Sequence, residues 1–230
     1  MPVIWIASEC RGKEKLEYLK QTIESCLAVP TTRKIVLSIH TDNILPFFDE
    51  RVIVKERKTC ISQFYHLSLL AVEEKEDSEE WITFMDDDDL LFSSIVPYYN
   101  HGSAFRSLQI IACAEDGKAV NGLSESVTPS DIPSILTNDY LLRDEDFSGC
   151  SCRFSLVQEY FSSRVINKYI EPLEDTRFMQ FLEDKGGKLS FEPLVFHRVF
   201  PSSVWRNTLL QKYARITGEN KPNTERTIIS

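Results

Sequence analysis

Several features that would indicate a membrane or nucleic-acid protein are missing from this sequence. No stretch approaches the roughly 20 consecutive apolar residues that a helix needs to cross a membrane. The apolar run over residues 2–7 is too short for a signal peptide, and charged residues follow it at once. Positive charge is scarce as well: the net charge is −9, whereas nucleic-acid surfaces need clustered Lys and Arg. We therefore expect a soluble cytoplasmic protein with no transmembrane segment and no nucleic-acid partner.

Common cofactor and phosphate motifs are also absent. The six cysteines include no Cys-x-x-Cys pair, so a zinc site or a disulfide framework has little support. The sequence contains no Gly-x-Gly-x-x-Gly and no phosphate-loop lysine motif, which are typical of dinucleotide-binding domains and ordinary ATPases. An anionic ligand would therefore have to be held locally, by a metal ion or by helix N-termini.

The most informative stretch is a buried strand that runs into four carboxylates. Residues 81–85 form an unbroken apolar, aromatic and β-branched run, as in strands covered on both faces, and Asp86 to Asp89 follow. Because they are two residues apart, Asp86 and Asp88 can turn toward one volume and offer oxygen ligands to a hard divalent cation. Asp87 and Asp89 would then face elsewhere. The other interpretation is a solvated turn whose acids cap a helix over residues 90–99.

Hydrophobic periodicity predicts alternating strands and helices in the first 100 residues. Strands are predicted over 3–7, 34–39, 51–55 and 81–85, and helices over 16–27 and 61–72. Because such units are right-handed and parallel, we expect an α/β fold with a central, mostly parallel sheet flanked by helices. The strand ends at 8–11, 40–42 and 86–89 would share one edge, which is where ligands bind in such sheets.

The second half of the sequence is less regular. A strand is predicted over 109–113, a turn over 115–117, and a long surface loop over 121–139. Helices are predicted over 154–160 and between Pro172 and Gly186, and a last strand over 188–196 ends at His197. Glu174 and Asp175, in the first turn of the second of these helices, either stabilise its dipole or belong to a site.

Four motifs, in this order, resemble those of the GT-A glycosyltransferases, in particular the family-2-like inverting group. IWIASECR resembles that family's first strand and loop, FMDDDD its Asp-x-Asp motif, EDTRF its Glu-Asp motif, and FHRVFPSS its final His-containing strand. The match covers residues 3–206. In size the chain is also similar to the small soluble GT-A enzymes of large algal viruses, which would place it in the cytoplasm of an infected host.

The resemblance implies roles for residues at matching positions. Asp86 and Asp87 would contact the nucleotide, Asp88 would hold Mn²⁺ or Mg²⁺ on the diphosphate, and Asp175 would be the general base. Asp86 and His197 are further candidate metal ligands. The other candidate nucleotide-sugar-binding residues are Ser8, Glu9, Arg11, His40, Asp42 and Gln63.

The resemblance also implies a domain organisation and partners. We expect one Rossmann-like GT-A domain over residues 1–216, with a nucleotide-sugar-binding half over 1–100 and an acceptor-binding half over 101–216. A polar tail follows over 217–230. The donor would be a nucleoside-diphosphate sugar, with a UDP-sugar favoured, and the acceptor a glycan or glycoprotein. Two positions depart from the family pattern: His40 stands where a base-recognising Asp is usual, with Asp42 two residues on, and Ser62-Gln63 matches an Arg-Asn pair only loosely.

Two other functions fit parts of the same pattern. A nucleotidyltransferase of similar α/β build also uses carboxylates and Mg²⁺, and it would release pyrophosphate in place of a nucleoside diphosphate. A non-catalytic sugar- or metal-binding module would keep the acidic site but would be unaffected by the change Asp175→Asn.

Overall fold

The computed structural model describes residues 2–45, 49–92, 102–112, 140–143, 147–169, 173–198 and 227–229. The predicted turn over 115–117, the loop over 121–139 and the tail over 217–226 lie outside these residues. No helix within the described ranges is both long and apolar enough to span a membrane.

The first half alternates strands and helices as the periodicity predicts. The elements are β1 (Val3–Cys10), α1 (Lys13–Ala28), β2 (Lys34–Thr41), β3 (Val52–Glu56), α2 (Gln63–Glu73) and β4 (Trp81–Met85). The bounds of β4 are those predicted. β1 and β2 extend two or three residues further than expected, because their polar ends, Glu9 and Cys10, pair in register with His40 and Thr41.

The strands form one mixed sheet. Its first part, β3-β2-β1-β4, is parallel throughout and confirms the predicted α/β fold. The sheet continues through β8 (Ser151–Arg153), which is antiparallel to β4, and then through β6 (Ala104–Ala112), β7 (Tyr140–Arg143) and β10 (Thr227–Ile229). β9 (Lys188–Phe196) pairs with β6 and with the short strand β5 (Leu90–Leu91).

The alternative interpretation, in which the acids cap a helix over residues 90–99, is wrong at the start of that segment. Leu90 and Leu91 pair antiparallel with Phe196 and Val195, so this segment is a strand. Both leucines are buried. Residues 93–99 lie outside the described part of the chain.

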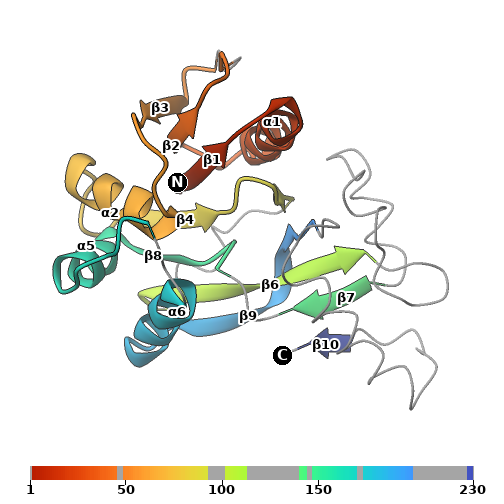
Figure 1. Ribbon diagram of the computed structural model, residues 1–230. Helices are drawn as coiled ribbons and strands as arrows, with labels where there is room; N and C mark the ends of the chain where they lie inside the picture. Colours follow the sequence, from red (N-terminus) through yellow and green to blue (C-terminus); the bar gives the residue numbers. More distant parts are fainter. Residues whose placement is uncertain are drawn as a thin grey trace.

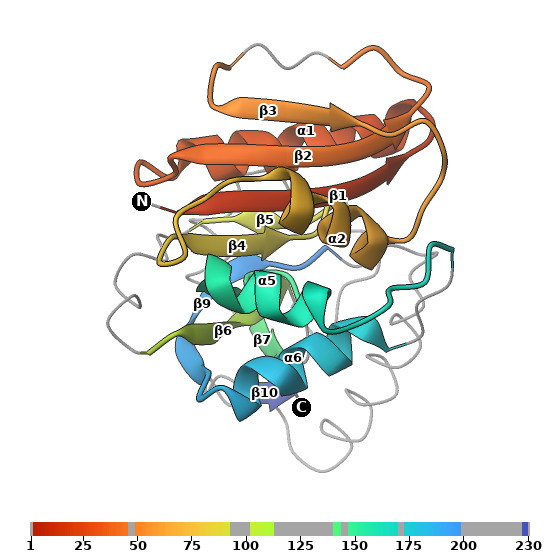
Figure 2. The same cartoon turned by 90° about the vertical axis from the view of Figure 1, so that its left-hand side faces the viewer.

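Helices cover both faces of the sheet (Figures 1 and 2). Because side chains alternate along a strand, Ile4 and Ile6 of β1 belong to one core with α1, whereas Val3 and Trp5 belong to another. This second core lies under α2, α5 (Phe154–Ser162) and α6 (Glu174–Asp184). The two cores fix where the end of β4 emerges, and the acidic run begins there.

Candidate functional site

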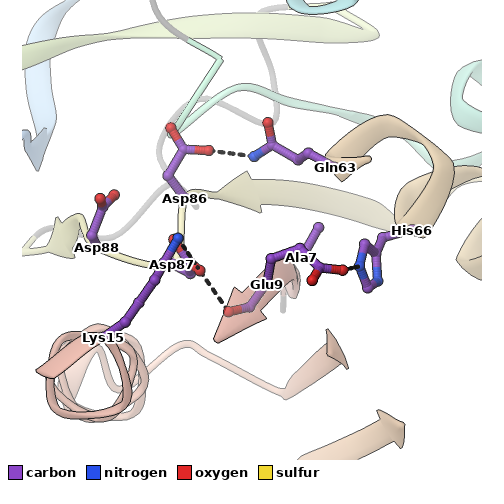
Figure 3. A pocket seen from close by; sticks show the side chains of 9 residues that line it. Ala7, Glu9, Lys15, Gln63, His66, Asp86, Asp87 and Asp88 are labelled. Carbon is purple, nitrogen blue, oxygen red and sulfur yellow. Dashed lines mark hydrogen bonds and ion pairs between the residues drawn. The ribbon is translucent and has the colours of Figure 1, made fainter. Parts of the chain in front are cut away.

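The carboxyl ends of β1 and β4 open into a cavity of about 270 Å³ (Figure 3). β1 and β4 are neighbouring parallel strands, with Ile6 paired to Met85, so the residues that follow these positions reach the same edge. The lining residues come from β1, α1, α2 and the turn after β4: Ala7, Ser8, Glu9, Lys15, Gln63, His66, Asp86, Asp87 and Asp88. Six of the predicted site residues therefore line the cavity at the predicted sheet edge: Ser8, Glu9, Gln63, Asp86, Asp87 and Asp88.

One side of the cavity is formed by Asp86, Asp87 and Asp88, which we call the acidic wall. The Gln63 side chain donates a hydrogen bond to Asp86 Oδ1 at 2.6 Å. Asp87 Oδ2 accepts a hydrogen bond from Ser8 Oγ at 2.5 Å and lies 3.4 Å from Lys15 Nζ. The expectation that Asp87 faces away from Asp86 and Asp88 is therefore wrong, because all three line the cavity.

The acidic wall has more acidic groups than cationic side chains to compensate them. Burial, together with repulsion from Asp87 and Asp89, raises the pKa of Asp88 to about 7. Among the described residues that line the cavity, Lys15 is the only Lys or Arg. A bound cation would relieve this repulsion.

Asp89 points away from the cavity and ties the acidic turn to the end of β9. Its side chain is fully buried and accepts hydrogen bonds from His197 Nδ1 at 2.9 Å and from the Arg198 backbone at 3.2 Å. Although burial opposes ionisation, His197 and Arg198 hold the pKa of Asp89 below its ordinary value. His197 therefore lies behind the acidic turn and does not line the cavity.

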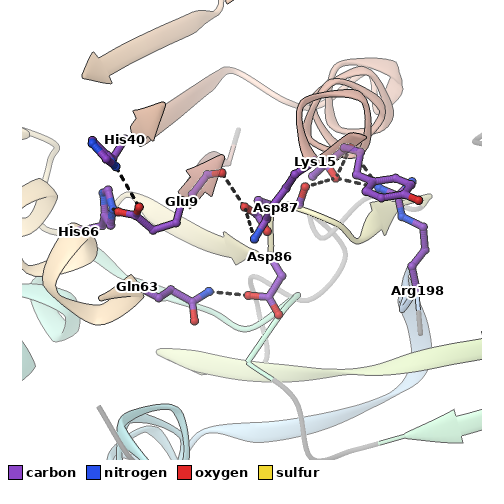
Figure 4. A network of polar contacts seen from close by, with 11 residues as sticks. Glu9, Lys15, His40, Gln63, His66, Asp86, Asp87 and Arg198 are labelled. Carbon is purple, nitrogen blue, oxygen red and sulfur yellow. Dashed lines mark hydrogen bonds and ion pairs between the residues drawn. The ribbon is translucent and has the colours of Figure 1, made fainter. Parts of the chain in front are cut away.

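Arg198 is a buried cation that the sequence analysis did not single out. It is 1% exposed and donates through Nε to the Asp88 carbonyl, through Nη1 to Gln21 at 2.6 Å, and through Nη2 to the Tyr18 carbonyl at 3.1 Å. Thr22 Oγ1 lies 3.1 Å from the Asp87 carbonyl. The backbone of the acidic turn is thus held by α1 and by the segment after β9 (Figure 4).

The opposite side of the cavity is centred on Glu9, and we call Glu9, His40 and His66 the acceptor wall. Glu9 Oε1 accepts from the Ile61 backbone at 2.9 Å and lies 3.2 Å from His66 Nε2, while Oε2 lies 3.1 Å from His40 Nδ1 (Figure 4). Burial acts to raise the pKa of Glu9, but these bonds and the Cys60 thiol hold it below the ordinary value. Glu9 therefore faces the cavity as a carboxylate.

Two lining residues with functional side chains, Lys15 and His66, were missed from the sequence. His66 comes three residues after Gln63 on α2, so the two share a helix face, and this spacing was a usable signal. Lys15 lies in the first turn of α1, directly beyond the end of β1, where a phosphate-binding side chain is expected in α/β folds.

The remaining candidates lie outside the cavity lining. Arg11 and Asp42 are exposed. His40 reaches the cavity only through Glu9. Asp175, at the start of α6, is partly buried, and its Oδ1 accepts the backbone N–H of Thr176 at 2.7 Å.

The residues present fit a hard divalent cation in chemical type, since the acidic wall offers carboxylate oxygens. Mg²⁺ in particular is often held by one or two carboxylates, with waters and substrate phosphates completing the shell. Within the described ranges, no group of three or more His, Cys, Asp or Glu residues is arranged as a metal site. The metal set of Asp86, Asp88 and His197 therefore stays a prediction.

Comparisons with known proteins show the fold. The sequence matches no protein-family model and no curated protein. The structure of GalNAc-T7 with UDP, GalNAc and Mn²⁺ has a TM-score of 0.52 over 94% of this chain, at 14% identity, and the chain covers 48% of that protein. A 4-diphosphocytidyl-2C-methyl-D-erythritol synthase has a TM-score of 0.51 at 9% identity, over 94% of this chain and 95% of the other. The corresponding cytidylyltransferase of Francisella tularensis, at 16% identity, covers 94% of this chain and 98% of the other, with a TM-score of 0.48.

The fold is therefore the Rossmann-like α/β type that GT-A glycosyltransferases share with these nucleotidyltransferases. At these identities the likeness is one of fold alone. The chemistry has to be argued from the cavity.

Proposed function

We propose that this protein is a metal-dependent inverting glycosyltransferase of the family-2-like group, which moves a sugar from a nucleoside-diphosphate donor to an acceptor hydroxyl. The observation that carries the proposal is the acidic wall: three consecutive carboxylates line one cavity at the end of a parallel strand. A diphosphate is repelled by such a wall unless a cation lies between them. The arrangement thus favours a ligand that arrives with a divalent metal.

The residues that would hold the metal are Asp88 and Asp86; His197, the third candidate from the sequence, bonds Asp89 and lies outside the cavity lining. When bound, the ion would stabilise the charge that develops on the leaving diphosphate. Lys15 lies at the same wall and supplies a further positive charge close to the diphosphate. Ser8 and Gln63 hold Asp87 and Asp86 in place, so that these carboxylates need little rearrangement when the ligand arrives.

Asp175 is the proposed general base. It would take the proton from the acceptor hydroxyl as the oxygen attacks the anomeric carbon, while the bond to the diphosphate breaks on the opposite face. It lies in the first turn of α6, and a negative charge is favoured at a helix N-terminus. We expect Asp175→Asn to keep donor binding but to lose about a thousandfold in turnover.

The matched control for this change is Asp184→Asn, at the other end of α6, which should leave turnover near the wild-type rate. Comparable turnover in the Asp175→Asn variant would exclude Asp175 as the base. Under the alternative of a non-catalytic binding module, neither variant would differ from the wild type in any measured property.

The direct test of the site is thermal unfolding with UDP, GDP, dTDP or CDP, each with and without Mn²⁺, for the wild type and Asp88→Ala. A ligand that binds the folded state raises the midpoint by mass action. We expect a rise for at least one diphosphate that needs both Mn²⁺ and Asp88. A rise that persists without Mn²⁺ and in Asp88→Ala would contradict the metal assignment.

A nucleotidyltransferase is the second candidate, favoured by Lys15 in the cavity and by the fold shared with the 4-diphosphocytidyl-2C-methyl-D-erythritol synthase. The net charge of −9 favours it less, because triphosphate substrates call for several cations. The products separate the two functions: sugar transfer releases a nucleoside diphosphate, and nucleotidyl transfer releases pyrophosphate. The donor we favour is a UDP-sugar, and the acceptor a glycan or glycoprotein.

A further inference from the structure

A chain of hydrogen bonds runs behind the acceptor wall and ends at Glu9. Arg57 Nε donates to Ser38 Oγ at 2.8 Å, and Ser38 Oγ lies 2.9 Å from His66 Nδ1. His66 Nε2 then lies 3.2 Å from Glu9 Oε1. Arg57 is itself held by Glu73 through two bonds of 2.7 and 2.9 Å.

Arg57 and Glu9, at the two ends of this series of hydrogen bonds, determine which partner donates at each step. A guanidinium can only donate, so Ser38 accepts from Arg57 and has its own hydroxyl proton to offer to His66. An ionised carboxylate can only accept, so His66 Nε2 must carry the proton that faces Glu9. The same neutral tautomer, with Nδ1 bare and Nε2 protonated, satisfies both ends, and burial, which lowers the pKa of His66, favours the neutral ring. Because Ser38 and His66 are both 0% exposed, water does not substitute for either partner.

Because of these hydrogen bonds, the side chain of Glu9 acts only as a hydrogen-bond acceptor. Its Oε1 is committed to Ile61 N–H and His66, and its Oε2 accepts from His40. The fourth partner is the Cys60 thiol, a weak donor on an exposed residue that a stronger N–H donor would displace. Glu9 therefore presents the cavity with an acceptor and has no proton to donate.

We propose that Arg57, Ser38 and His66 act as a one-directional relay that fixes Glu9 as an acceptor, so that the cavity selects a nucleobase with an imino N–H. This rests on the proposed function, which places a nucleoside diphosphate in the cavity. Uracil, thymine and guanine carry such an N–H on the ring, whereas cytosine presents an unprotonated ring nitrogen at that position and can meet the carboxylate only through its exocyclic NH₂ group. His66 is in this sense a positioning residue, and Glu9 determines specificity.

The first experiment measures the affinity of the full chain for UDP, dTDP, GDP and CDP with Mn²⁺ by calorimetry. At least one imino-bearing diphosphate should bind about tenfold more tightly than CDP, as expected for one well-placed base contact. CDP binding as tightly as the best of the other three would overturn the proposal.

The change Glu9→Gln tests the direction of the relay. Because Ile61 and His66 both donate to Oε1, the amide oxygen should take that place and the NH₂ group should take the place of Oε2. The wall would then offer a donor, and the preference over CDP should fall about tenfold. An unchanged preference in this variant would contradict the role of Glu9.

His66 is tested with two variants. His66→Leu removes both hydrogen bonds and should weaken the preferred diphosphate about tenfold, whereas His66→Gln can accept from Ser38 and donate to Glu9, and should restore most of the affinity. If His66→Leu does not fold, the comparison of His66→Gln with Ser38→Ala replaces it, because Ser38→Ala breaks the relay one step earlier.

A readout without nucleotide separates this inference from the proposed function. ¹⁵N NMR of the histidine side chains should show His66 protonated at Nε2 and bare at Nδ1 in the wild type. The opposite tautomer would overturn the relay whatever binds in the cavity. If none of the four diphosphates binds, the proposed function and the choice of base both fail, and the tautomer alone then decides whether the relay exists.

Discussion

The two walls of the cavity carry the same kind of group, a carboxylate, in opposite electrostatic states. Glu9 on the acceptor wall has a lowered pKa because donors from β2, α2 and the Ile61 backbone surround it. Asp88 on the acidic wall has a pKa raised to about 7 because it is buried beside other acids. The carboxylate of the acceptor wall is surrounded by donors of the protein, whereas the three carboxylates of the acidic wall share one ammonium, that of Lys15.

This contrast teaches which part of the site is organised before a ligand arrives. Directional hydrogen bonds fix the acceptor wall, so it can discriminate between ligands without rearranging. The backbone of the acidic wall is held by Arg198 and Thr22. Ser8 and Gln63 bond two of its carboxylates, but the acidic side chains retain their mutual repulsion. We infer that recognition belongs to the first wall and the need for metal to the second.

Removing the anchor of the acidic wall should have the largest effect. Arg198→Met should lower the free energy of unfolding by about 3 kcal/mol, because it leaves the carbonyls of Tyr18 and Asp88 and the side chain of Gln21 without their buried donor. Urea denaturation measures this loss. Arg51→Met, which breaks the partly exposed pair with Asp49, is the matched control and should shift the midpoint far less. Equal shifts for the two variants would show that Arg198 does not anchor the turn.

Neutralising the acidic wall should stabilise the protein. A raised pKa means that the folded state binds the proton more tightly than the unfolded chain, so ionising Asp88 costs stability as pH rises from about 4 to 7. Asp88→Asn should therefore gain about 1 to 2 kcal/mol at pH 8, less than the full shift implies because the residue keeps some contact with solvent. The gain should vanish near pH 4.

The check is urea denaturation of Asp88→Asn and wild type at both pH values, with the exposed change Glu17→Gln on α1 as control. A loss of stability at pH 8 would mean that the acidic wall is not strained. The contrast between the repelling carboxylates of the acidic wall and the hydrogen-bonded Glu9 of the acceptor wall would then not hold.

The sequence predicted the parts of this site that depend on local pattern. The predicted bounds of the strand Trp81–Met85 are correct to the residue, because an unbroken apolar and β-branched run is typical of a strand buried on both faces. The acids after it mark the end of the strand. The sequence did not predict the short strand of Leu90 and Leu91, because its partner strand at residues 195–196 lies more than 100 residues away. The pairing of Glu9 with His66 likewise joins residues 57 apart, and no spacing rule along one element reveals it.

Lys15 should matter more for binding than for stability. Its Nζ is the one ammonium lining the described cavity, and it lies on the acidic wall. Lys15→Met should weaken the preferred nucleoside diphosphate with Mn²⁺ about tenfold, whereas Lys13→Met, exposed two residues earlier on α1, should change it less than about twofold. Equal effects of the two changes in calorimetry would show that Lys15 acts only through general charge.

The smallest expected effect is the pH dependence that His66 adds to stability. Burial lowers the pKa of His66, with Arg57 and His40 also acting to lower it, while Glu9 acts in the opposite direction. The unfolded chain therefore binds the proton first as pH falls below about 6.5, so the folded state loses stability between that value and the lowered pKa. His66→Gln has no such group, so its stability deficit relative to wild type should shrink as the pH falls from 7.5 to 5. A deficit that grows on acidification would mean that His66 is protonated in the fold, and the acceptor wall would then carry a charge where the relay requires a neutral ring.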